Sequence, residues 1–286
     1  ANPDDRARFF DLHAAGFNRL SLGVQSLRDT ELQFLGRNHN AEQALLAVEA
    51  ATDIFEKVSL DFIYALPDQH LDQWLHDLGR IAHMGAGHLS LYQLTIEPQT
   101  AFGKAAERGT LIPMPDDRAA DFYEATQETM CTLGFPAYEV SNHAQPGQEA
   151  RHNALYWEEA DWIGVGPSAA GRLGPADARL ATVGAQHTVG YPDLAKDERI
   201  IVQNLTHQEH LIETIAGGLR PMSGLSLSRL GSAQTAVCGA AEPLIDQGFL
   251  KLEQERLRAT ARGRLVLDHL AANLAAALPD ETSPLA

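Results

Sequence analysis

Apolar, strand-like segments alternate with helical segments over the first half of this chain. The strand-like segments are residues 18–24 (NRLSLGV), 58–66 (VSLDFIYAL) and 88–95 (HLSLYQLT), and sequence with helical spacing of its apolar residues follows each of them. This alternation predicts parallel βαβ units with right-handed crossovers and helices on the outside. We expect the strands to be buried on both faces, and residues 136–140 to form a fourth strand.

Polar residues gather at the carboxyl ends of these segments. In a parallel (β/α) barrel the chemistry lies in the loops at those ends, so Gln25, the residues after Asp61 and residues 93–97 fall where a site is expected. Three or four strands do not close a barrel. We therefore expect further strand–helix units before residue 1, and residues 1–143 to be the C-terminal part of a barrel.

The second half has a different composition. Residues 144–205 are rich in glycine, proline and small side chains, and we expect loops and short strands there. In residues 206–275 we expect helices at 209–219, 225–230, 236–247 and 262–274, with a hairpin at 249–259. That order is typical of a winged-helix module. The module has no basic stripe, so we favour a structural or protein-docking role over DNA binding.

The composition excludes several classes of partner. A formal net charge of −16 opposes binding to nucleic acid, because the non-specific part of that affinity depends on clustered lysine and arginine. No apolar run approaches the roughly 18 residues of a membrane span, so we expect no stable membrane insertion. The only cysteines, Cys131 and Cys238, lie far apart, which fits a reducing compartment such as the cytoplasm.

Residues 151–157 (RHNALYW) are the densest group of rings and hydrogen-bonding side chains in the chain. One interpretation is the start of a helix or strand, with Leu155 and Trp157 packed inward and with His152 and Asn153 capping a backbone end. The other is a surface for a flat, aromatic molecule, because a macrocycle stacks on Tyr156 and Trp157 and takes an axial ligand from histidine or tyrosine.

Asp61 lies inside an apolar strand, where a carboxylate is unfavourable unless it is paired or hydrogen-bonded. A structural partner, such as a backbone amide or a nearby arginine, explains it as well as a ligand hydroxyl or ammonium does. Together with Gln25 and Arg37, Asp61 forms a predicted polar ring for a small zwitterion such as an amino acid.

Six segments, taken in order, carry a resemblance to a known family. They are FNRLSLGVQS (17–26), LGRNH (35–39), SLDFIYALPDQ (59–69), HLSLYQLTIEPQT (88–100), YEVSNHAQPGQEARHNALYW (138–157) and GVGP (164–167). Together they resemble the radical SAM family of oxygen-independent coproporphyrinogen III oxidase-like proteins, and within it the HemW haem chaperones are most similar. The HNxxYW motif, formed here by His152, Asn153, Tyr156 and Trp157, resembles the haem-binding signature of those chaperones.

The resemblance implies an α/β fold: a partial (β/α)6 radical SAM barrel, incomplete in this chain, with a C-terminal winged-helix-like helical domain. It implies haem at the HNxxYW motif, with His152 as first choice for ligand of the iron and with His143 and Tyr156 as competitors. It also implies S-adenosyl-L-methionine (SAM) at a set of matching positions, of which the last two match less closely: Gln25, Arg37, Asp61, Ile63 and Thr95.

Three departures from the family pattern stand out. Family members hold a 4Fe-4S cluster with a CxxxCxxC loop, which this sequence lacks, and the resemblance places that loop before residue 1. Ala65 and Asp68 stand where the family's YGLPGQ motif has glycines. Residues 168–171 (SAAG) replace the family's GAHS, with loss of a histidine.

Three functions compete at this point. The first is a haem chaperone, whose partners are haem and acceptor haemoproteins and which needs no substrate turnover. The second is a radical SAM oxidoreductase that acts on a tetrapyrrole, and the third is an inactive scaffold. The HNxxYW motif favours the first. A monomer and a homodimer both stay open.

Overall fold

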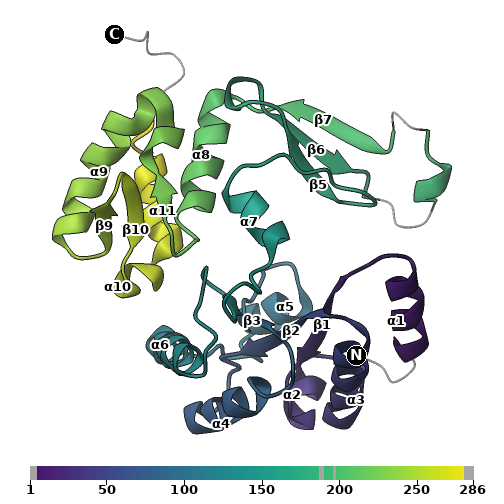
Figure 1. Ribbon diagram of the computed structural model, residues 1–286. Coiled ribbons are helices and arrows are strands. Elements are labelled where there is room, and N and C mark those ends of the chain that lie inside the picture. The colour runs from purple at the N-terminus through teal and green to yellow at the C-terminus, as the bar shows by residue number, and fades with distance from the viewer. Residues whose placement is uncertain (1–4, 187–189, 196–197, 280–286) are drawn as a thin grey trace. The chain divides into compact units, whose positions relative to one another are not determined.

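The computed structural model describes residues 5–186, 190–195 and 198–279, and the chain forms two compact units, Ala1–Glu149 and Ala150–Ala286 (Figure 1). The elements of the first unit are α1 (Asp5–Ala14), β1 (Arg19–Gln25), α2 (Asp29–Phe34), α3 (Ala41–Ile54), β2 (Lys57–Tyr64), α4 (Leu71–Ile81), β3 (His88–Gln93), α5 (Ala101–Glu107), α6 (Asp116–Thr132) and β4 (Asn142–Ala144). They alternate as the sequence predicts.

The first unit is built on a four-stranded sheet of order β1-β2-β3-β4. β1, β2 and β3 are parallel, which confirms the predicted βαβ units, whereas β4 runs antiparallel to β3. The prediction of a strand at residues 136–140 is wrong. Those residues enter a tight turn, in which the Tyr138 amide donates to the Asn142 carbonyl at 3.1 Å and the Glu139 side chain accepts from the Ser141 amide at 2.7 Å.

The two faces of this sheet differ in chemistry. On one face lie apolar side chains that belong to the buried core of the unit: Leu22, Val24, Leu60, Phe62, Leu89 and Leu91. The opposite face, called the polar face below, carries the alternate residues of the same strands: Arg19, Ser21, Ser59, Asp61, His88 and Ser90. β2 and β3 are buried on both faces along most of their length, as expected, but the burial is apolar on one face only.

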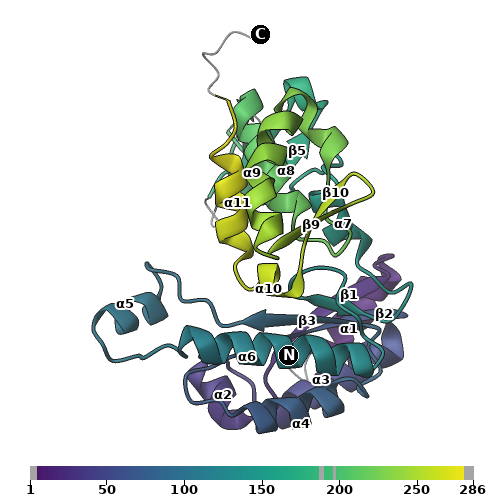
Figure 2. The same ribbon diagram turned by 90° about the vertical axis from the view of Figure 1, so that its left-hand side faces the viewer.

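Helices α2, α3, α4 and α6 lie on one side of the sheet (Figure 2). Tyr64, at the end of β2, stacks on Trp74 of α4 with ring centroids 5.0 Å apart, and the Trp74 indole donates to the Thr126 hydroxyl of α6 at 2.8 Å. Because each fully buried large side chain stabilises the fold by about 1.5–3 kcal/mol, this apolar side is the main source of cohesion in the unit.

The second unit contains two small antiparallel sheets, of order β5-β6-β7 and β8-β10-β9. Its elements are α7 (Arg151–Trp157), β5 (Ala170–Leu173), η1 (Ala176–Ala178), β6 (Leu180–Gly184), η2 (Tyr191–Asp193), β7 (Ile200–Asn204), α8 (His207–Gly218), β8 (Leu225–Ser226), η3 (Leu227–Ala233), α9 (Gln234–Asp246), β9 (Leu250–Glu253), β10 (Arg256–Ala259), α10 (Ala261–Arg264) and α11 (Leu267–Ala275). The hairpin β9–β10 beside α8, α9 and α11 has the predicted winged-helix order.

One predicted helix of this unit is wrong. Residues 225–230 begin as strand β8, in which Leu225 pairs with Leu257, and continue as the 3-10 helix η3. Gly231 interrupts η3 with φ 52° and ψ −128°, so the segment does not propagate as an α-helix. Helical spacing over six residues was too short to distinguish these structures.

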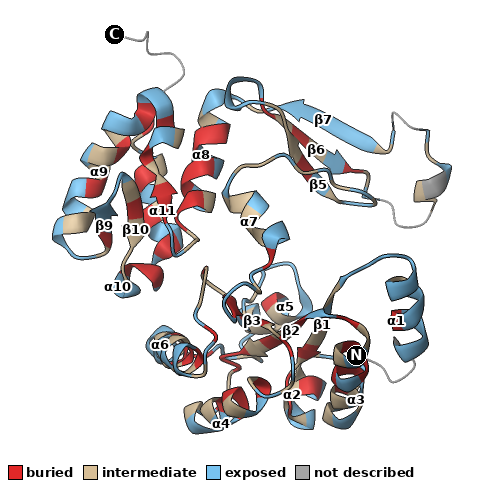
Figure 3. Cartoon of the chain, viewed as in Figure 1, coloured by how far each residue is buried: buried red, intermediate tan, exposed pale blue. Residues whose placement is uncertain are grey.

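Strand β7 is exposed at all five of its residues, and it includes Ile200, Ile201 and Val202 (Figure 3). Within the described residues it pairs on one side only, with β6. Over those same residues, no helix is long and apolar enough to cross a membrane.

Candidate functional site

Gln25 ends β1 in an unusual backbone conformation. Its φ is 73°, in the left-handed region that non-glycine residues seldom adopt, and the register between β1 and β2 shifts between Gly23 and Gln25. The side chain folds back over Gly23, where a Cβ atom would overlap the Gln25 amide nitrogen. Backbone strain of this kind persists where the surroundings impose it, and it is concentrated at functional sites.

Gln25 and Arg37 line one pocket of about 460 Å³, together with Gly23, Gly36, Asn38, His39 and Gln43. The exposed Arg37 follows α2, and His39 fixes the segment through a 3.2 Å hydrogen bond between its Nε2 and the Val24 carbonyl. Two of the predicted SAM residues therefore share a polar pocket at the carboxyl end of β1.

Asp61 is not among the residues that line this pocket; it lies on the polar face, where its register partner on β1 is Gly23, which does line the pocket. Its carboxylate accepts from Ser21 Oγ at 3.1 and 3.0 Å and from Ser59 Oγ at 3.3 Å. Burial raises the pKa of Asp61, while the hydroxyls of Ser21, Ser90 and Ser59 and the charge of Arg19 lower it. The structure thus supplies the hydrogen-bonding partners that a carboxylate in an apolar strand requires.

The two weaker SAM positions are less closely grouped. Ile63 follows Asp61 by two residues on the same face of β2, and it is partly buried. Thr95 is exposed in the loop after β3. Gln25, Asp61 and Ile63 lie toward the carboxyl ends of the paired strands β1 and β2, whereas Thr95 follows the next strand, β3.

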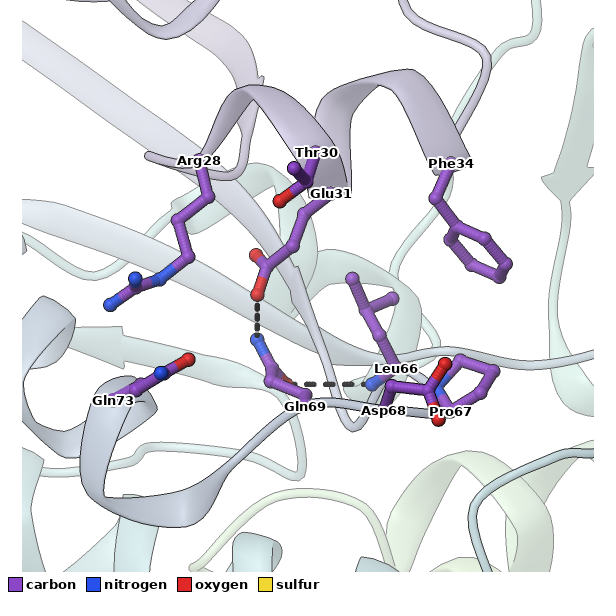
Figure 4. Close-up of a pocket in the computed structure, with 9 residues that line it drawn as sticks. All are labelled: Arg28, Thr30, Glu31, Phe34, Leu66, Pro67, Asp68, Gln69 and Gln73. Atoms are coloured by element: carbon purple, nitrogen blue, oxygen red, sulfur yellow. Dashed lines mark hydrogen bonds between the residues drawn. The ribbon is translucent and has the colours of Figure 1, made fainter.

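A second pocket lies between the loop after β1 and the loop after β2 (Figure 4). Its volume is about 400 Å³, and it is lined by Arg28, Thr30, Glu31, Phe34, Leu66, Pro67, Asp68, Gln69 and Gln73. Gln69 Nε2 donates to Glu31 at 3.1 Å, and Arg28 Nε donates to Asp77 at 2.8 Å. Our reading of the sequence missed this pocket. The only signal was the polar residues that directly follow the two strands.

Helix α7 carries the HNxxYW residues of the second unit. His152 is exposed, and its Nε2 lies 2.6 Å from the Tyr156 hydroxyl one helical turn later. The His152 and Tyr156 rings meet edge to face with centroids 4.7 Å apart, and Tyr156 meets Trp162 in the same way at 4.9 Å. The rings of His152, Tyr156 and Trp162 therefore contact one another in series, beginning at the exposed His152 and ending at Trp162.

The interpretation of this segment as the start of a helix is confirmed, because α7 begins at Arg151. Its N-cap is Ala150, which has no side-chain capping group, rather than His152 or Asn153. Leu155 is 39% exposed rather than packed inward, whereas Asn153 and Trp157 are partly buried. Arg229 Nη1 donates to the Trp157 carbonyl at 2.8 Å, so the end of α7 is fixed while its His152 face stays open.

His143 is not an exposed alternative to His152. It lies on β4 in the first unit with no exposed surface, and its Nδ1 lies 3.3 Å from the Phe135 carbonyl. Burial lowers the pKa of His143 to about 4. Its closeness to His152 in sequence therefore does not give it a comparable environment.

Comparison with known proteins places this geometry in a family. Residues 205–266 match the family model described as the HemN C-terminal domain. The mouse protein named radical S-adenosyl methionine domain-containing protein 1, mitochondrial, is 38% identical, over 90% of this chain and 62% of its own length. The Mycobacterium tuberculosis protein named heme chaperone HemW is 35% identical, over 94% of this chain and 68% of its own length. The chain belongs to the HemW-like radical SAM family.

The solved structure of coproporphyrinogen III oxidase (HemN) from Escherichia coli, described as a radical SAM enzyme, shares the fold. The TM-score is 0.74 at 20% identity, over 97% of this chain and 69% of that one. This confirms the predicted radical SAM architecture with its C-terminal helical domain. The chain spans less than two thirds of the length of the mouse relative.

Membership of the HemW-like family implies SAM, a 4Fe-4S cluster and haem in general terms, and the residues present fit these groups unequally. The exposed imidazole and the phenol of α7 are suitable donors for haem iron. The Gln25–Arg37 pocket beside Asp61 offers an amide, a guanidinium and a carboxylate to the polar parts of SAM.

The 4Fe-4S cluster does not fit the residues of this chain. Cys131 lies on α6 and Cys238 on α9, in different units, whereas such a cluster needs several thiolates in one place. The part of the chain that the structure describes contains no group of three histidine, cysteine or acidic side chains that could hold a metal ion.

Two of the departures from the family's motifs share one backbone feature. Ala65 and Ser168 stand where the HemW-like motifs have glycine, and both adopt left-handed conformations, with φ 57° and φ 58°. Asp68, the third such position, is not among the residues with positive φ. At Ala65 and Ser168 the backbone therefore has the left-handed conformation that glycine adopts readily, although neither residue is glycine.

Proposed function

We propose that this chain acts as a haem chaperone, which binds haem at α7 and transfers it to acceptor haemoproteins. The observation that carries the proposal is the exposed His152–Tyr156 pair on α7, in a chain that is 35% identical to a HemW haem chaperone. Haem, when bound, supplies an iron that takes an axial ligand. The chain supplies the imidazole, the neighbouring rings of Tyr156 and Trp157, and the exposed guanidinium of Arg151 for a propionate.

The hydrogen bond between His152 and Tyr156 competes with ligation of haem iron by His152. His152 Nε2 is engaged by the Tyr156 hydroxyl at 2.6 Å, so ligation through Nε2 requires this bond to break. A hydrogen bond contributes about 0.5–1.5 kcal/mol net, which lowers affinity by only about two- to tenfold. A chaperone must also release its cargo, and a modest competing contact favours release.

Haem titration of the purified chain, followed at the Soret band, tests this proposal. His152→Ala is expected to lose the shifted band, whereas His207→Ala, which removes another exposed histidine of the same unit, is expected to keep it. Tyr156→Phe is expected to tighten binding by about two- to tenfold, because it frees Nε2. Identical titrations of wild type and His152→Ala would sink the assignment of His152.

A second proposal concerns Gln25, Arg37 and Asp61, which we assign to the polar parts of SAM, with Ile63 and Thr95 as apolar and peripheral contacts. Their grouping at one edge of the sheet supports it. Calorimetric titration with S-adenosylhomocysteine, which needs no cluster, tests it. We expect Arg37→Ala to weaken binding about tenfold or more, because a charged hydrogen-bond partner is lost, and absence of binding by the wild type would contradict the assignment.

The alternative of a coproporphyrinogen III oxidase-like oxidoreductase rests on the same pocket and on the fold. The HNxxYW residues on an exposed helix favour the chaperone over it. We propose residues 144–205 as the haem-carrying segment and 206–275 as a docking module. A cytoplasmic location is our proposal also, although the mouse relative is named as mitochondrial.

A further inference from the structure

A series of hydrogen-bonding side chains crosses the polar face and ends at Asp61. The Tyr138 hydroxyl lies 2.7 Å from His88 Nε2, and His88 Nδ1 lies 2.7 Å from Ser59 Oγ. Ser59 Oγ lies 3.3 Å from Asp61 Oδ1. Ser59 and His88 are register partners on β2 and β3, so the sheet itself fixes their contact.

The direction of these hydrogen bonds follows from what each group can donate. An ionised Asp61 only accepts, so Ser59 donates its single proton to the carboxylate. Ser59 Oγ then accepts from His88 Nδ1. Burial lowers the pKa of His88 to about 3, so the imidazole is neutral at pH 7 and carries one N–H. Nε2 therefore lacks a proton and accepts from Tyr138.

We propose that Tyr138, His88 and Ser59 are positioning residues, whose hydrogen bonds all point toward Asp61 and hold its carboxylate ionised and oriented toward the pocket at Gln25. This inference rests on the proposed SAM site, because SAM has hydroxyl groups that can donate hydrogen bonds to the oriented carboxylate. Asp61 is thereby prepared before any ligand binds, which reduces the ordering that binding requires.

The other groups around Asp61 are compatible with this role. Arg19 of β1 faces it and favours its charged form, and Ser21 donates to both of its oxygens. Lys57, at the start of β2, is exposed. His143 faces away, on the apolar face with its register partner Leu89. The groups in contact with Asp61 are therefore hydroxyl donors, and the charge that acts on it is the cation of Arg19.

A purely structural role for the same residues makes a different prediction. Polar side chains that only fill the polar face affect the stability of the unit, and they have no reason to share one hydrogen-bond direction. Positioning of Asp61 requires that His88 be the Nδ1–H tautomer. It also requires the titration midpoint of Asp61 to depend on the Ser59 hydroxyl.

Two NMR measurements on the full chain test the proposal. The ¹⁵N shifts of the His88 ring report the tautomer directly in the wild type, without any substitution, and we expect Nδ1–H. The ¹³C shift of the Asp61 carboxyl, followed with pH, reports its midpoint. Ser59→Ala is expected to raise the midpoint by about one pH unit, the shift for loss of one hydrogen bond to a charged group, and Ser59→Thr is expected to restore it.

Thr126→Val is the matched control, because it removes a buried hydroxyl of the same unit that bonds to Trp74 and not to Asp61. It is expected to lower stability and to leave the Asp61 midpoint unchanged. An Nε2–H tautomer in the wild type, or an unchanged midpoint in a folded Ser59→Ala protein, would overturn the inference. Failure of S-adenosylhomocysteine to bind, with both NMR results as expected, would overturn the SAM site alone.

Discussion

The polar face of the first unit and helix α7 of the second both gather rings and hydrogen-bonding side chains, but they hold them differently. On the polar face, Asp61 accepts from two serines at 3.0–3.3 Å and His88 is hydrogen-bonded at both ring nitrogens. On α7, His152 is exposed and has one hydrogen bond, to Tyr156 of the same helix. The first arrangement is fixed by strand register, whereas the second depends on a single exchangeable contact.

This difference fits the two kinds of ligand proposed for them. A small polar molecule gains most from groups that are already oriented, because less ordering is needed on binding. A cargo that must leave again is better served by a ligand residue with a competing partner. The comparison also makes the regions experimentally separable, since substitutions on the polar face should affect stability and those on α7 should not.

Acidification should produce the largest effect, and it should act mainly on the first unit, although burial also lowers the pKa of His210 in the second unit. Burial depresses the pKa of His88 to about 3 and of His143 to about 4, against 6.5 when unfolded. Below pH 6.5 the unfolded state binds protons that the folded state does not, so stability falls as pH falls, by up to about 1.4 kcal/mol per unit and per histidine. Urea denaturation at pH 7, 6 and 5 should show a loss of roughly 2 kcal/mol in the last step.

His143→Leu isolates one of these contributions. The side chain is fully buried on the apolar face, so leucine is tolerated there, and the pH slope should fall by about one half. Thr126→Val, which removes no ionisable group from the same unit, should leave the slope as it is. A slope that did not change in His143→Leu would show that other groups cause the acid sensitivity. Burial raises the pKa of Asp61, so protonation of this carboxyl at low pH favours the folded state and offsets part of the loss of stability caused by the histidines.

Removal of Asp61 should rank next. Asp61→Ala leaves the hydroxyls of Ser21 and Ser59 without this acceptor and removes the negative charge that faces Arg19, which should lower the free energy of unfolding by about 1–3 kcal/mol at pH 7. His152→Ala, on the exposed face of α7, should change it by less than about 0.5 kcal/mol. Equal effects of the two substitutions, measured by chemical denaturation, would remove the distinction between the regions.

The smallest effects concern Ala65 and Ser168, one in each unit, which both have φ near +57°. A left-handed conformation costs a non-glycine residue roughly 1–2 kcal/mol. Ser168 is exposed, so Ser168→Gly should stabilise the chain by about 1 kcal/mol. Ala65 is buried, so Ala65→Gly also loses a methyl worth about 0.8 kcal/mol, and it should be nearly neutral. Thermal unfolding of both variants measures the difference.

The sequence was sufficient for features that repeat with a fixed period. The three parallel strands and their helices follow from apolar spacing. The polar face was not predicted, because the strands were expected to be buried on both faces and the serines that alternate with leucines were not considered. The left-handed bulge at Gln25 was not predictable, because it arises from pairing with β2 and not from the residue itself. Nor was β4, since the Glu139 side chain turns the chain just before it.

The contacts between the site residues show the same contrast between local spacing and pairing of distant strands. The His152–Tyr156 contact depends on spacing of four within a helix, and the sequence left helix and strand open for that segment. The hydrogen bonds from Tyr138 to His88 and onward join residues 50 and 29 positions apart, and only the sheet brings them together. The assignment of the α7 residues to haem, and of Gln25, Arg37 and Asp61 to SAM, stays a prediction.

Strand β7 has a practical consequence for anyone who handles this protein. Its isoleucines and valine are exposed on a strand that pairs on one side within the described residues, and such an edge invites another copy to add to the sheet. At low ionic strength the net charge of −16 keeps molecules apart, but at 0.1 M salt this repulsion is screened beyond about 10 Å. Dilute buffers should therefore preserve monodisperse samples, and high-salt purification steps should favour colloidal association.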